Sequence, residues 1–177
     1  MTKPSATKKK MSSIPESHSV TIPAAVLTVS DSAAAGKRKD LSGPAVTDVL
    51  TQANFKVVAT EVVADEQRQI EAVLRRLAQK AHFIVTTGGT GIATRDVTPE
   101  ATRAVCERLV EGIAERMRSE STKKTPLAAL GRGICGVRGN TLILNVPGNP
   151  TAAVESLQSV LEIIPHALDL LAGKTGH

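Results

Sequence analysis

TTGGTGIATRDVTPE, at residues 86–100, places a glycine-rich turn directly behind a short apolar run that extends from Phe83 to Val85. An Arg-Asp pair follows the turn, and Thr98-Pro99-Glu100 is then a typical start of a helix. Glycine lets the backbone approach a ligand closely, and free N–H groups at such a turn attract negative charge. The stretch therefore predicts an anion pocket at the end of a buried strand.

Strand-like and helix-like segments alternate on both sides of this turn. Apolar runs predict strands at 24–30, 55–63, 82–86 and 141–146. Apolar side chains at helical spacing predict helices at 42–53, behind Asp65, over 98–121 with a break near Gly112, and from 150 to 171 with a division at Pro165. Residues 125–138 are loop-rich and show no clear element. The alternation predicts an α/β fold, a three-layer α/β/α domain at 21–177 with a mostly parallel sheet.

The first 20 residues predict a disordered basic tail. They hold four lysines and one glutamate, so only a small part of the overall charge of +5 is left for the domain. The chain has two Phe and neither Trp nor Tyr, which leaves no aromatic platforms for stacking bases. No apolar run approaches the ~20 residues that span a bilayer, and the tail has no secretory apolar stretch. We therefore expect neither a nucleic-acid nor a membrane partner.

The cysteines and histidines give no sign of a structural metal or of a disulfide scaffold. Cys106 and Cys135 are far apart and outside any CxxC pair, so buried free thiols are favoured over a disulfide. The four histidines lack the spacing of zinc ligands. This usage is typical of a reducing compartment, and we expect a cytoplasmic protein.

Polar or glycine-rich turns follow each of the four predicted strands. They are Ser30-Asp31, Asp65, the turn from Gly88 to Asp96, and the turn from Pro147 to Pro150. In doubly wound sheets, ligands bind at the carboxyl ends of the strands near a topological switch point. The four turns are therefore expected to share one edge of the sheet and to form one composite site.

Two common glycine motifs do not fit. A Walker phosphate loop needs a Lys after its glycines, and none follows here. A dinucleotide fingerprint needs GxGxxG at the start of the helix itself, whereas Thr94 stands at the third glycine position and the helix begins near Thr98.

The motif GGTGxxxRDxTPE, together with TVSDS at 28–32 and GNTLILNVPGNP at 139–150, resembles the molybdopterin-binding family. The match extends over about residues 22–172 and is nearest to the stand-alone molybdopterin adenylyltransferases; it is also similar to the N-terminal domain of gephyrin. The resemblance implies transfer of AMP from Mg·ATP to the terminal phosphate of molybdopterin, with release of pyrophosphate, in molybdenum cofactor synthesis. It further implies a homotrimer and a separate molybdenum insertion protein that receives the product. A non-catalytic molybdopterin carrier or scaffold is the alternative.

Asp65 and Asp96 match the acidic positions that the family uses for magnesium and nucleotide, and are the predicted catalytic residues and Mg²⁺ ligands. A hard cation among phosphates is typically held by one or two carboxylates together with water. From the sequence alone, the structural alternative for Asp65 is a plain N-cap of the helix that follows it. For Asp96 the alternative is a loop ion pair with Arg95, but its position behind the glycine turn favours a functional role.

The predicted substrate-binding residues come from the same turns. They are Ser30, Asp31, Ser32, Ser42, Gly43, Thr87, Gly88, Gly89, Thr90, Gly91, Arg95, Pro147, Gly148 and Asn149. Each has a structural alternative: a tight turn without ligand, a polar strand end, or a helix cap. The basic loop 37–39 either neutralises pyrophosphate or is a solvated surface. Gly131 stands where family members often carry Ser, so a hydrogen bond from that serine to a ligand has no counterpart here.

Overall fold

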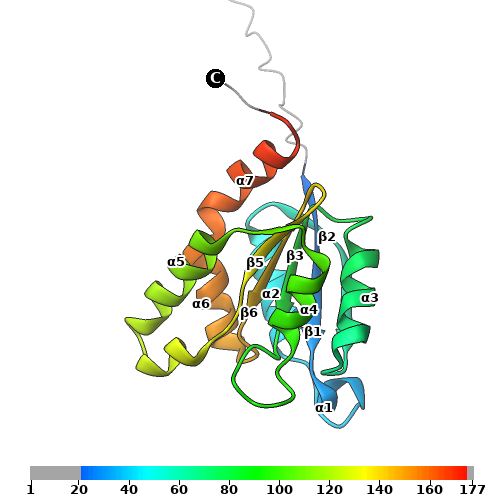
Figure 1. Cartoon of the computed structure of the whole chain (residues 1–177), viewed down its shortest axis with the longest axis vertical. Helices are drawn as coiled ribbons and strands as arrows, with labels where there is room; N and C mark the ends of the chain where they lie inside the picture. The colour runs from blue at the N-terminus through cyan, green and yellow to red at the C-terminus, as the bar shows by residue number, and fades with distance from the viewer. Residues whose placement is uncertain (1–20, 175–177) are drawn as a thin grey trace, which may run out of the picture.

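The computed structural model describes residues 21–174, which form a six-stranded sheet with helices on both faces (Figure 1). Its strands are β1 (Ile22–Val29), β2 (Phe55–Val63), β3 (Phe83–Thr87), β4 (Arg108–Leu109), β5 (Cys135–Arg138) and β6 (Thr141–Val146). The strand order is β2-β1-β3-β6-β5-β4. The first four strands in this order are parallel, whereas β5 runs antiparallel to both β6 and β4. The predicted three-layer fold with a mostly parallel sheet is confirmed.

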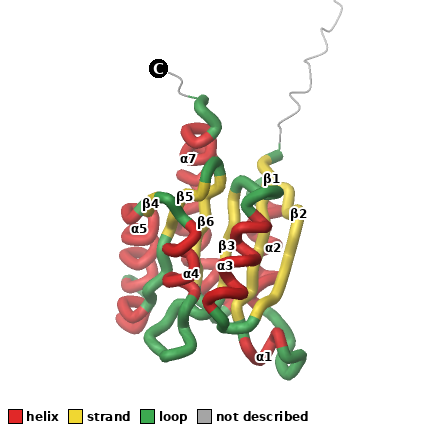
Figure 2. Tube along the Cα trace, turned by 45° about the vertical axis from the view of Figure 1, so that its right-hand side comes forward, coloured by secondary structure: helices red, strands yellow, loops and turns green. Residues whose placement is uncertain are grey.

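The helices divide between the two faces of the sheet, as the tube in Figure 2 shows. Packed against one face are α2 (Ser42–Gln52), α5 (Glu111–Thr122), α6 (Pro150–Val160) and α7 (Ile164–Leu171). The other face is covered by α3 (Gln67–Leu77) and α4 (Thr98–Val105). A short helix, α1 (Asp31–Ala34), follows the end of β1, directly behind the polar turn at Ser30. Two 3₁₀ turns complete the set: η1 (Pro126–Leu130) and η2 (Leu161–Ile163).

Alternation along β1 explains why its sequence is apolar throughout. Ala24 and Val26 belong to the core beneath α2 and α6, whereas Ala25 and Leu27 belong to the core beneath α3 and α4. All four side chains are buried. A strand covered on both faces needs apolar residues at successive positions, and this produces a continuous run in place of an alternating one.

The position of β1 between β2 and β3 creates the crevice in which the site lies. The connection through α2 leads to β2 on one side of β1, and the connection through α3 returns to β3 on the other side. This is a topological switch point, where the loops behind two adjacent strands separate. The chain leaves β1 at Ser30 and β3 at Gly88, so these two turns flank the crevice.

Two regions differ from the sequence prediction. The single helix expected over 98–121 is divided at Cys106–Val110 by β4, and Gly112 lies in the first turn of α5 instead of at the break. The loop-rich region 125–138 contains η1 and β5. Strand β4 exists through its pairing with β5, in which Leu109 faces Gly136. A strand of only two residues is too short to show a periodic pattern in the sequence.

The division predicted at Pro165 is confirmed, because η2 separates α6 from α7.

The two thiols are free, as the sequence predicted. Burial raises the pKa of Cys106 to about 11 and the pKa of Cys135 to about 12. Because the folded state holds these protons more tightly than the unfolded state, the stabilisation from the neutral thiols is lost as pH rises from 9 towards these values.

We therefore expect both thiols to resist alkylation in the native protein at pH 8, since the thiolate is the reactive form. Titration with a chromogenic disulfide should detect almost no thiol in the native protein and both thiols after denaturation. Rapid reaction before unfolding, of the buried Cys135 or of the half-buried Cys106, would contradict the neutral state of these thiols.

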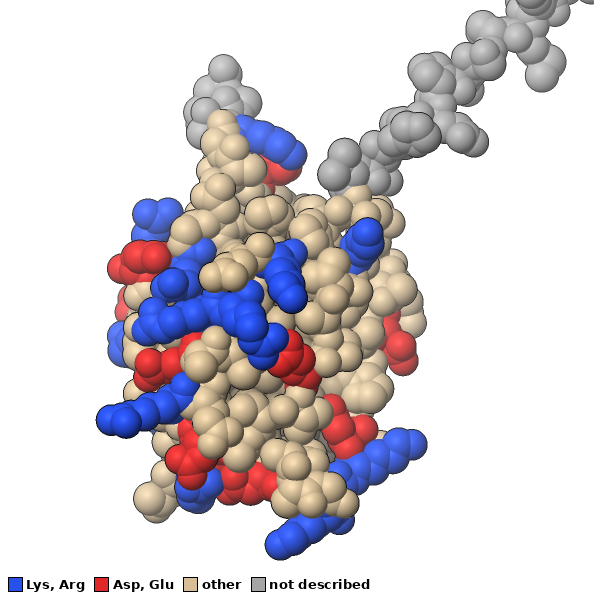
Figure 3. Space-filling view, turned by 90° about the vertical axis from the view of Figure 1, so that its right-hand side faces the viewer, with Lys and Arg blue, Asp and Glu red and all other residues tan. Residues whose placement is uncertain are grey.

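No helix within residues 21–174 is long and apolar enough to cross a membrane. The predicted basic tail at 1–20 lies outside the described residues. On the face shown in Figure 3, several Lys and Arg side chains form a central group bordered by Asp and Glu side chains, and other Lys and Arg side chains lie apart from it. Charges of both signs therefore share this face.

Candidate active site

The four polar turns predicted to converge do meet at the carboxyl edge of the parallel strands. A cavity of about 460 Å³ is lined by Ser30 behind β1, Asp65 behind β2, Gly88 behind β3 and Asn149 behind β6. We call it the first pocket. Its remaining lining includes Arg38, Lys39, Asp40, Ser42, Thr87, Gly89, Asp96 and Gly148. The lining is therefore rich in polar groups and backbone, as expected for a site that takes phosphates.

Two glycines of the turn occupy backbone positions that other residues do not tolerate. Gly88 has φ +99°, and a Cβ built on it would lie 2.2 Å from the carbonyl oxygen of Val29. Gly89 has φ +62°, and its Cβ would lie 2.4 Å from Oγ1 of Thr98. The turn is thus packed directly against the end of β1. Glycine is required because both the conformation and the space exclude a side chain.

Thr98 lies at the start of a helix, as the sequence predicted, but its side chain does not cap that helix. It is the first residue of α4, and Val97 stands at the N-cap position without a side-chain cap. The Thr98 hydroxyl donates to the carbonyl of Gly88 over 2.9 Å, and the Thr98 N–H donates to the carbonyl of Gly89 over 3.0 Å. Thr98 therefore fastens the glycine turn to the helix instead of capping that helix.

The turn after β6 is bonded to the glycine turn. The hydroxyl of Thr87 donates to the carbonyl of Pro147 over 2.7 Å, and the N–H of Gly88 donates to the carbonyl of Val146 over 3.3 Å. Asn149 caps α6, because its Oδ1 accepts from the N–H of Ala152. Its side chain is therefore occupied by the cap, although the residue also lines the first pocket.

Asp65 is not the cap of the next helix. Glu66 occupies the N-cap position of α3, and its side chain makes no cap bond. Instead, Oδ2 of Asp65 accepts from the N–H of Asp31 over 2.8 Å, and the N–H of Asp65 donates to Oδ1 of Asp31 over 2.9 Å. Burial raises the pKa of Asp65, and the nearby negative charges of Asp31 and Asp96 add to this effect. The carboxylate thus belongs to an acidic pair at the pocket wall.

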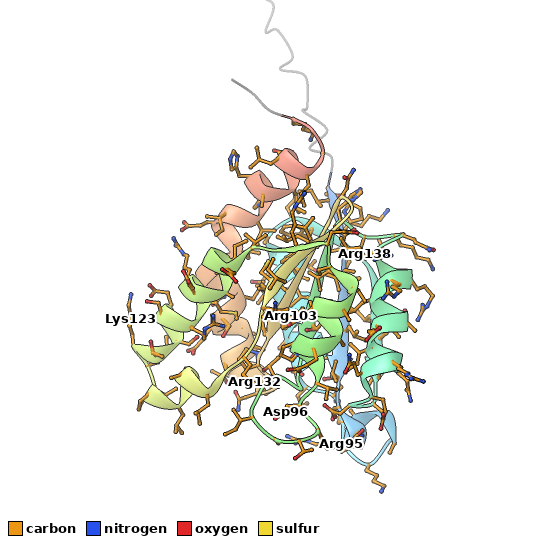
Figure 4. The ribbon with its side chains drawn as sticks, in the orientation of Figure 1. Arg95, Asp96, Arg103, Lys123, Arg132 and Arg138 are labelled. Carbon is orange, nitrogen blue, oxygen red and sulfur yellow. The ribbon has the colours of Figure 1, made fainter. Side chains whose placement is uncertain are left out.

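Asp96 is not the ion-pair partner of Arg95, which was the structural alternative. Its Oδ2 accepts from the N–H of Ala93 over 2.9 Å within the loop. Arg95 instead pairs with Asp31 and Glu66, at 2.9 and 2.8 Å. Figure 4 labels both residues on the loop that follows the glycine turn. Asp96 lines the first pocket, whereas Arg95 does not.

A second pocket of about 510 Å³ lies on the other side of the same wall. Its lining is more apolar and includes Met117, Leu127, Leu130 and Ala152, together with the basic residues Arg118 and Lys124. Gly89, Asp96 and Gly148 line both pockets. Two molecules bound in the two cavities would therefore meet across the glycine turn and the Asp96 carboxylate.

Most of the predicted site residues lie in these two pockets. The first holds Ser30, Ser42, Thr87, Gly88, Gly89, Gly148, Asn149, Asp65 and Asp96. The second holds Thr90, Gly91 and Pro147 and shares three of the residues just named. Asp31, Ser32, Gly43 and Arg95 line neither pocket. Ser32 contacts the hydroxyl of Ser30 at 3.2 Å, and the N–H of Gly43 already donates to Asp40 at 3.0 Å. The Gly43 amide therefore donates to a side chain of the protein itself, whereas the sequence predicted that it would bind a substrate anion.

The family model that describes a probable molybdopterin binding domain matches residues 25–166, most of the described part of the chain. The chain belongs to the molybdopterin-binding domain family. It is 43% identical over 157 residues to the molybdopterin adenylyltransferase of Helicobacter pylori strain J99, a match that spans 86% of this chain and 89% of that enzyme. The Escherichia coli K12 molybdopterin adenylyltransferase is 37% identical, with 84% of each chain covered.

Solved structures agree with the family. The molybdopterin biosynthesis enzyme MoaB of Thermus thermophilus has a TM-score of 0.82 at 50% identity, and the match spans 86% of this chain and 98% of that one. The structure of MogA has a TM-score of 0.79 at 38% identity, over 84% and 99% of the two chains. The family resemblance found in the sequence motifs is therefore confirmed, together with the fold.

The sequence analysis did not assign two further residues of this molybdopterin-binding domain to the site. Each of them holds other residues in place through hydrogen bonds. Asp40 receives hydrogen bonds from the hydroxyl of Thr28 at 2.6 Å and from the N–H of Gly43 at 3.0 Å. It thereby fixes the start of α2 beside the first pocket. Asn145 is fully buried and donates to the hydroxyls of Thr86 and Thr102, at 2.9 Å each. A polar residue within the buried run TLILNV was the available sequence signal.

Arg132 is the third residue that the sequence analysis did not assign. Its Nε donates to the carbonyl of Gly91 over 2.7 Å, its Nη2 donates to the carbonyl of Asp96 over 2.6 Å, and it forms an ion pair with Glu100. Its own N–H donates to the carbonyl of Thr90 over 2.8 Å. One guanidinium therefore holds both ends of the loop that carries Asp96. Gly131 precedes it, where a Cβ would lie 3.1 Å from the carbonyl of Ala128, so serine fits there only after a small shift.

Arg132→Ala is expected to lower the free energy of unfolding by about 1–3 kcal/mol, because the charged bonds to two loop carbonyls are lost. For a chain of this size, this corresponds to a fall in Tm of roughly 3–10 °C. Differential scanning calorimetry measures it. The matched control is Arg116→Ala, because Arg116 also binds a carbonyl and a glutamate, Ser159 and Glu162, but far from the glycine turn. Equal Tm changes in the two variants would contradict a special role of Arg132.

Proposed function

We propose that this protein transfers AMP from Mg·ATP to the terminal phosphate of molybdopterin, releasing pyrophosphate, as a step of molybdenum cofactor synthesis. The arrangement of two pockets on either side of one wall carries the proposal. Group transfer between two substrates needs both to be held with their reacting atoms in contact. The shared wall of Gly89, Asp96 and Gly148 supplies such a meeting point. The naming of its bacterial relatives as molybdopterin adenylyltransferases supports the same activity.

The character of each lining suggests which substrate it takes. The first pocket combines the hydroxyls of Ser30 and Ser42 with the cations Arg38 and Lys39, which suits a nucleotide triphosphate. The cations come from the basic loop, so its role in neutralising pyrophosphate gains support. The second pocket combines apolar surface with Arg118 and Lys124, which suits a pterin that carries a phosphate.

Asp65 and Asp96 fit a magnesium ion. Within residues 21–174, no group of three or more His, Cys, Asp and Glu side chains forms a cage for a metal. Two carboxylates beside a phosphate pocket are nevertheless the donor set that Mg²⁺ typically uses, with phosphate oxygens and water as its other ligands. Mg²⁺ bound by Asp65 and Asp96 would offset the negative charge of the phosphates. Burial is the main cause of the raised pKa of Asp65, and the charges of Asp31 and Asp96 raise it further.

The reaction needs no nucleophile from the protein. An oxygen of the molybdopterin phosphate attacks the α-phosphorus of ATP, a new P–O–P bond forms, and the bond to the β-phosphate breaks with its electron pair leaving on pyrophosphate. The protein's contribution is to position the two phosphates and to offset their charge. Backbone N–H groups of the glycine turn and the cations of both pockets serve these two tasks.

Incubation of the protein with molybdopterin and Mg·ATP, followed by measurement of pyrophosphate and adenylylated molybdopterin, tests the proposal. We expect equal amounts of both products from the wild type and a loss of turnover in Asp96→Ala. Tight binding of molybdopterin without turnover would instead establish the non-catalytic carrier.

The proposal extends to a homotrimer in the cytoplasm that passes its product to a separate molybdenum insertion protein. The free thiols of Cys106 and Cys135 support a reducing compartment. The trimer follows from the family resemblance. Size-exclusion chromatography with light scattering measures the mass directly, and a stable monomer would refute the trimer.

A further inference from the structure

Arg95 is turned away from both pockets and towards carboxylates on the outside of the site. Its Nε and Nη2 donate to the two oxygens of Asp31 over 2.9–3.1 Å, and its Nη1 donates to Glu66 over 2.8 Å. Figure 4 places Arg95 on the part of the loop that faces α1. The guanidinium therefore joins three chain segments, namely the end of β1, the end of β2 and the loop behind the glycine turn.

Asp31, the main partner of Arg95, is bonded in turn to Asp65. The N–H of each aspartate donates to the carboxylate of the other, at 2.8 and 2.9 Å. Oδ1 of Asp31 thus accepts from both Arg95 and the backbone of Asp65. This shared oxygen connects the guanidinium to the segment that carries Asp65.

The exchange of hydrogen bonds fixes which way the Asp65 carboxylate points. Its Oδ2 is occupied by the N–H of Asp31, while its Oδ1 lies 3.0 Å from the position of a Cβ on Gly89 and so faces the glycine turn. Among residues 21–174, no donor binds that second oxygen. It is the oxygen available to a ligand in the first pocket.

We infer that Arg95 and Asp31 are positioning residues, which hold the Asp65 carboxylate towards the glycine turn through the chain of contacts Arg95–Asp31–Asp65. The inference rests on the proposed function, because it assigns Asp65 to Mg·ATP. It replaces the sequence prediction that Arg95 and Asp31 bind substrate.

A purely structural ion pair would behave differently. The side chains of Arg95 and Asp31 are 55% and 48% exposed, and exposed pairs typically contribute under about 1 kcal/mol to stability. Partners that orient a metal ligand, by contrast, typically change metal affinity about 10–100-fold when removed. The two roles are thus separated by measuring stability and ligand affinity on the same variants.

The chain offers a matched control in Arg76. It binds both oxygens of Glu61, at 2.8 and 2.6 Å, with a side chain that is 50% exposed. Arg76 lines neither pocket. Arg76→Ala therefore removes an equivalent two-point ion pair without touching the aspartates of the site.

Isothermal titration calorimetry with Mg·ATP, and separately with molybdopterin, tests the inference on Arg95→Ala, Asp31→Ala, their double variant and Arg76→Ala. We expect the Kd for Mg·ATP to rise about 10-fold in either single variant, and no further in the double variant because both belong to one network. Arg95→Lys should recover only part of the affinity, since an ammonium does not bind both oxygens of Asp31 as a fork. Molybdopterin affinity and Tm should remain near the wild-type values, and Arg76→Ala should change none of these quantities.

An unchanged Kd for Mg·ATP in Arg95→Ala would overturn the inference. A parallel loss of both affinities together with a lower Tm would also overturn it, because that pattern indicates a structural role. A wild type that binds Mg·ATP but forms no adenylylated product would refute the proposed function, while the ratio of the Kd values would still decide the positioning role. A wild type that does not bind Mg·ATP would refute both.

Discussion

Asp65→Asn is expected to lose adenylyl transfer by on the order of 10²–10³-fold while it keeps its fold. In the proposed mechanism, the substitution removes the negative charge that would hold Mg²⁺ beside the phosphates, but it leaves an oxygen that accepts the N–H of Asp31. A steady-state assay of pyrophosphate release, with the Mg²⁺ concentration varied, measures the loss. Asp96→Asn should show a loss of the same order, because Asp96 lies on the wall shared by both pockets.

The stability of Asp65→Asn should move in the opposite direction to its activity. Burial and the charges of Asp31 and Asp96 raise the pKa of Asp65, so ionising this carboxyl costs more free energy in the folded protein than in the unfolded chain. Asparagine removes that cost, and Tm at pH 7 should be equal to or higher than that of the wild type. Asp169→Asn, in α7 at the far end of the molecule from the glycine turn, serves as the control and should retain full activity (Figure 1). A large fall in Tm for Asp65→Asn would show that Asp65 is mainly structural.

Gly88→Ala is expected to destabilise the protein by about 3–5 kcal/mol, because backbone strain and steric overlap add. The new Cβ would lie 2.2 Å from the carbonyl oxygen of Val29, and the backbone carbonyl of a central strand has no room to move. Gly148 closes the other side, since its own Cβ would lie 3.1 Å from the Cα of Gly88. Chemical denaturation should give the free energy change, and Tm should fall by about 10 °C or more.

Gly139→Ala separates the effect of backbone strain from the effect of steric overlap. Gly139 also has a left-handed backbone, with φ +53°, but nothing lies within 4 Å of a Cβ at that position. It should therefore cost only about 1 kcal/mol, from the backbone conformation alone. If the two variants were equally stable, the close packing of the glycine turn against β1 would not be an energetic constraint.

Local patterns in the sequence predicted most of the elements. The continuous apolar run of β1 indicated a strand covered on both faces, and Pro165 indicated the division between α6 and α7. The glycine turn, with its Arg-Asp pair, indicated the pocket. These features can be predicted from the sequence because the residues that form them are neighbours in the chain.

The sequence did not predict elements that depend on pairing with residues far away in the chain. Strand β4 has two residues and is defined by its pairing with β5, about 27 positions further along. The sequence therefore predicted a break near Gly112, whereas the helix is divided a few residues earlier, at β4. The hydrogen bonds of Asn145 to Thr86 and Thr102 likewise join segments 59 and 43 residues apart.

The sequence by itself determined the family, the α/β architecture and the set of turns that form the site, because short apolar runs, glycines and prolines act on the local backbone. Only the tertiary structure decided what each charged side chain does. Arg95 binds Asp31, which is 64 positions away, although Asp96 is adjacent, and Asp65 exchanges hydrogen bonds with Asp31 instead of capping α3. The partner of a charge depends on which strand ends the sheet places side by side, and that order is set by the packing of the whole domain.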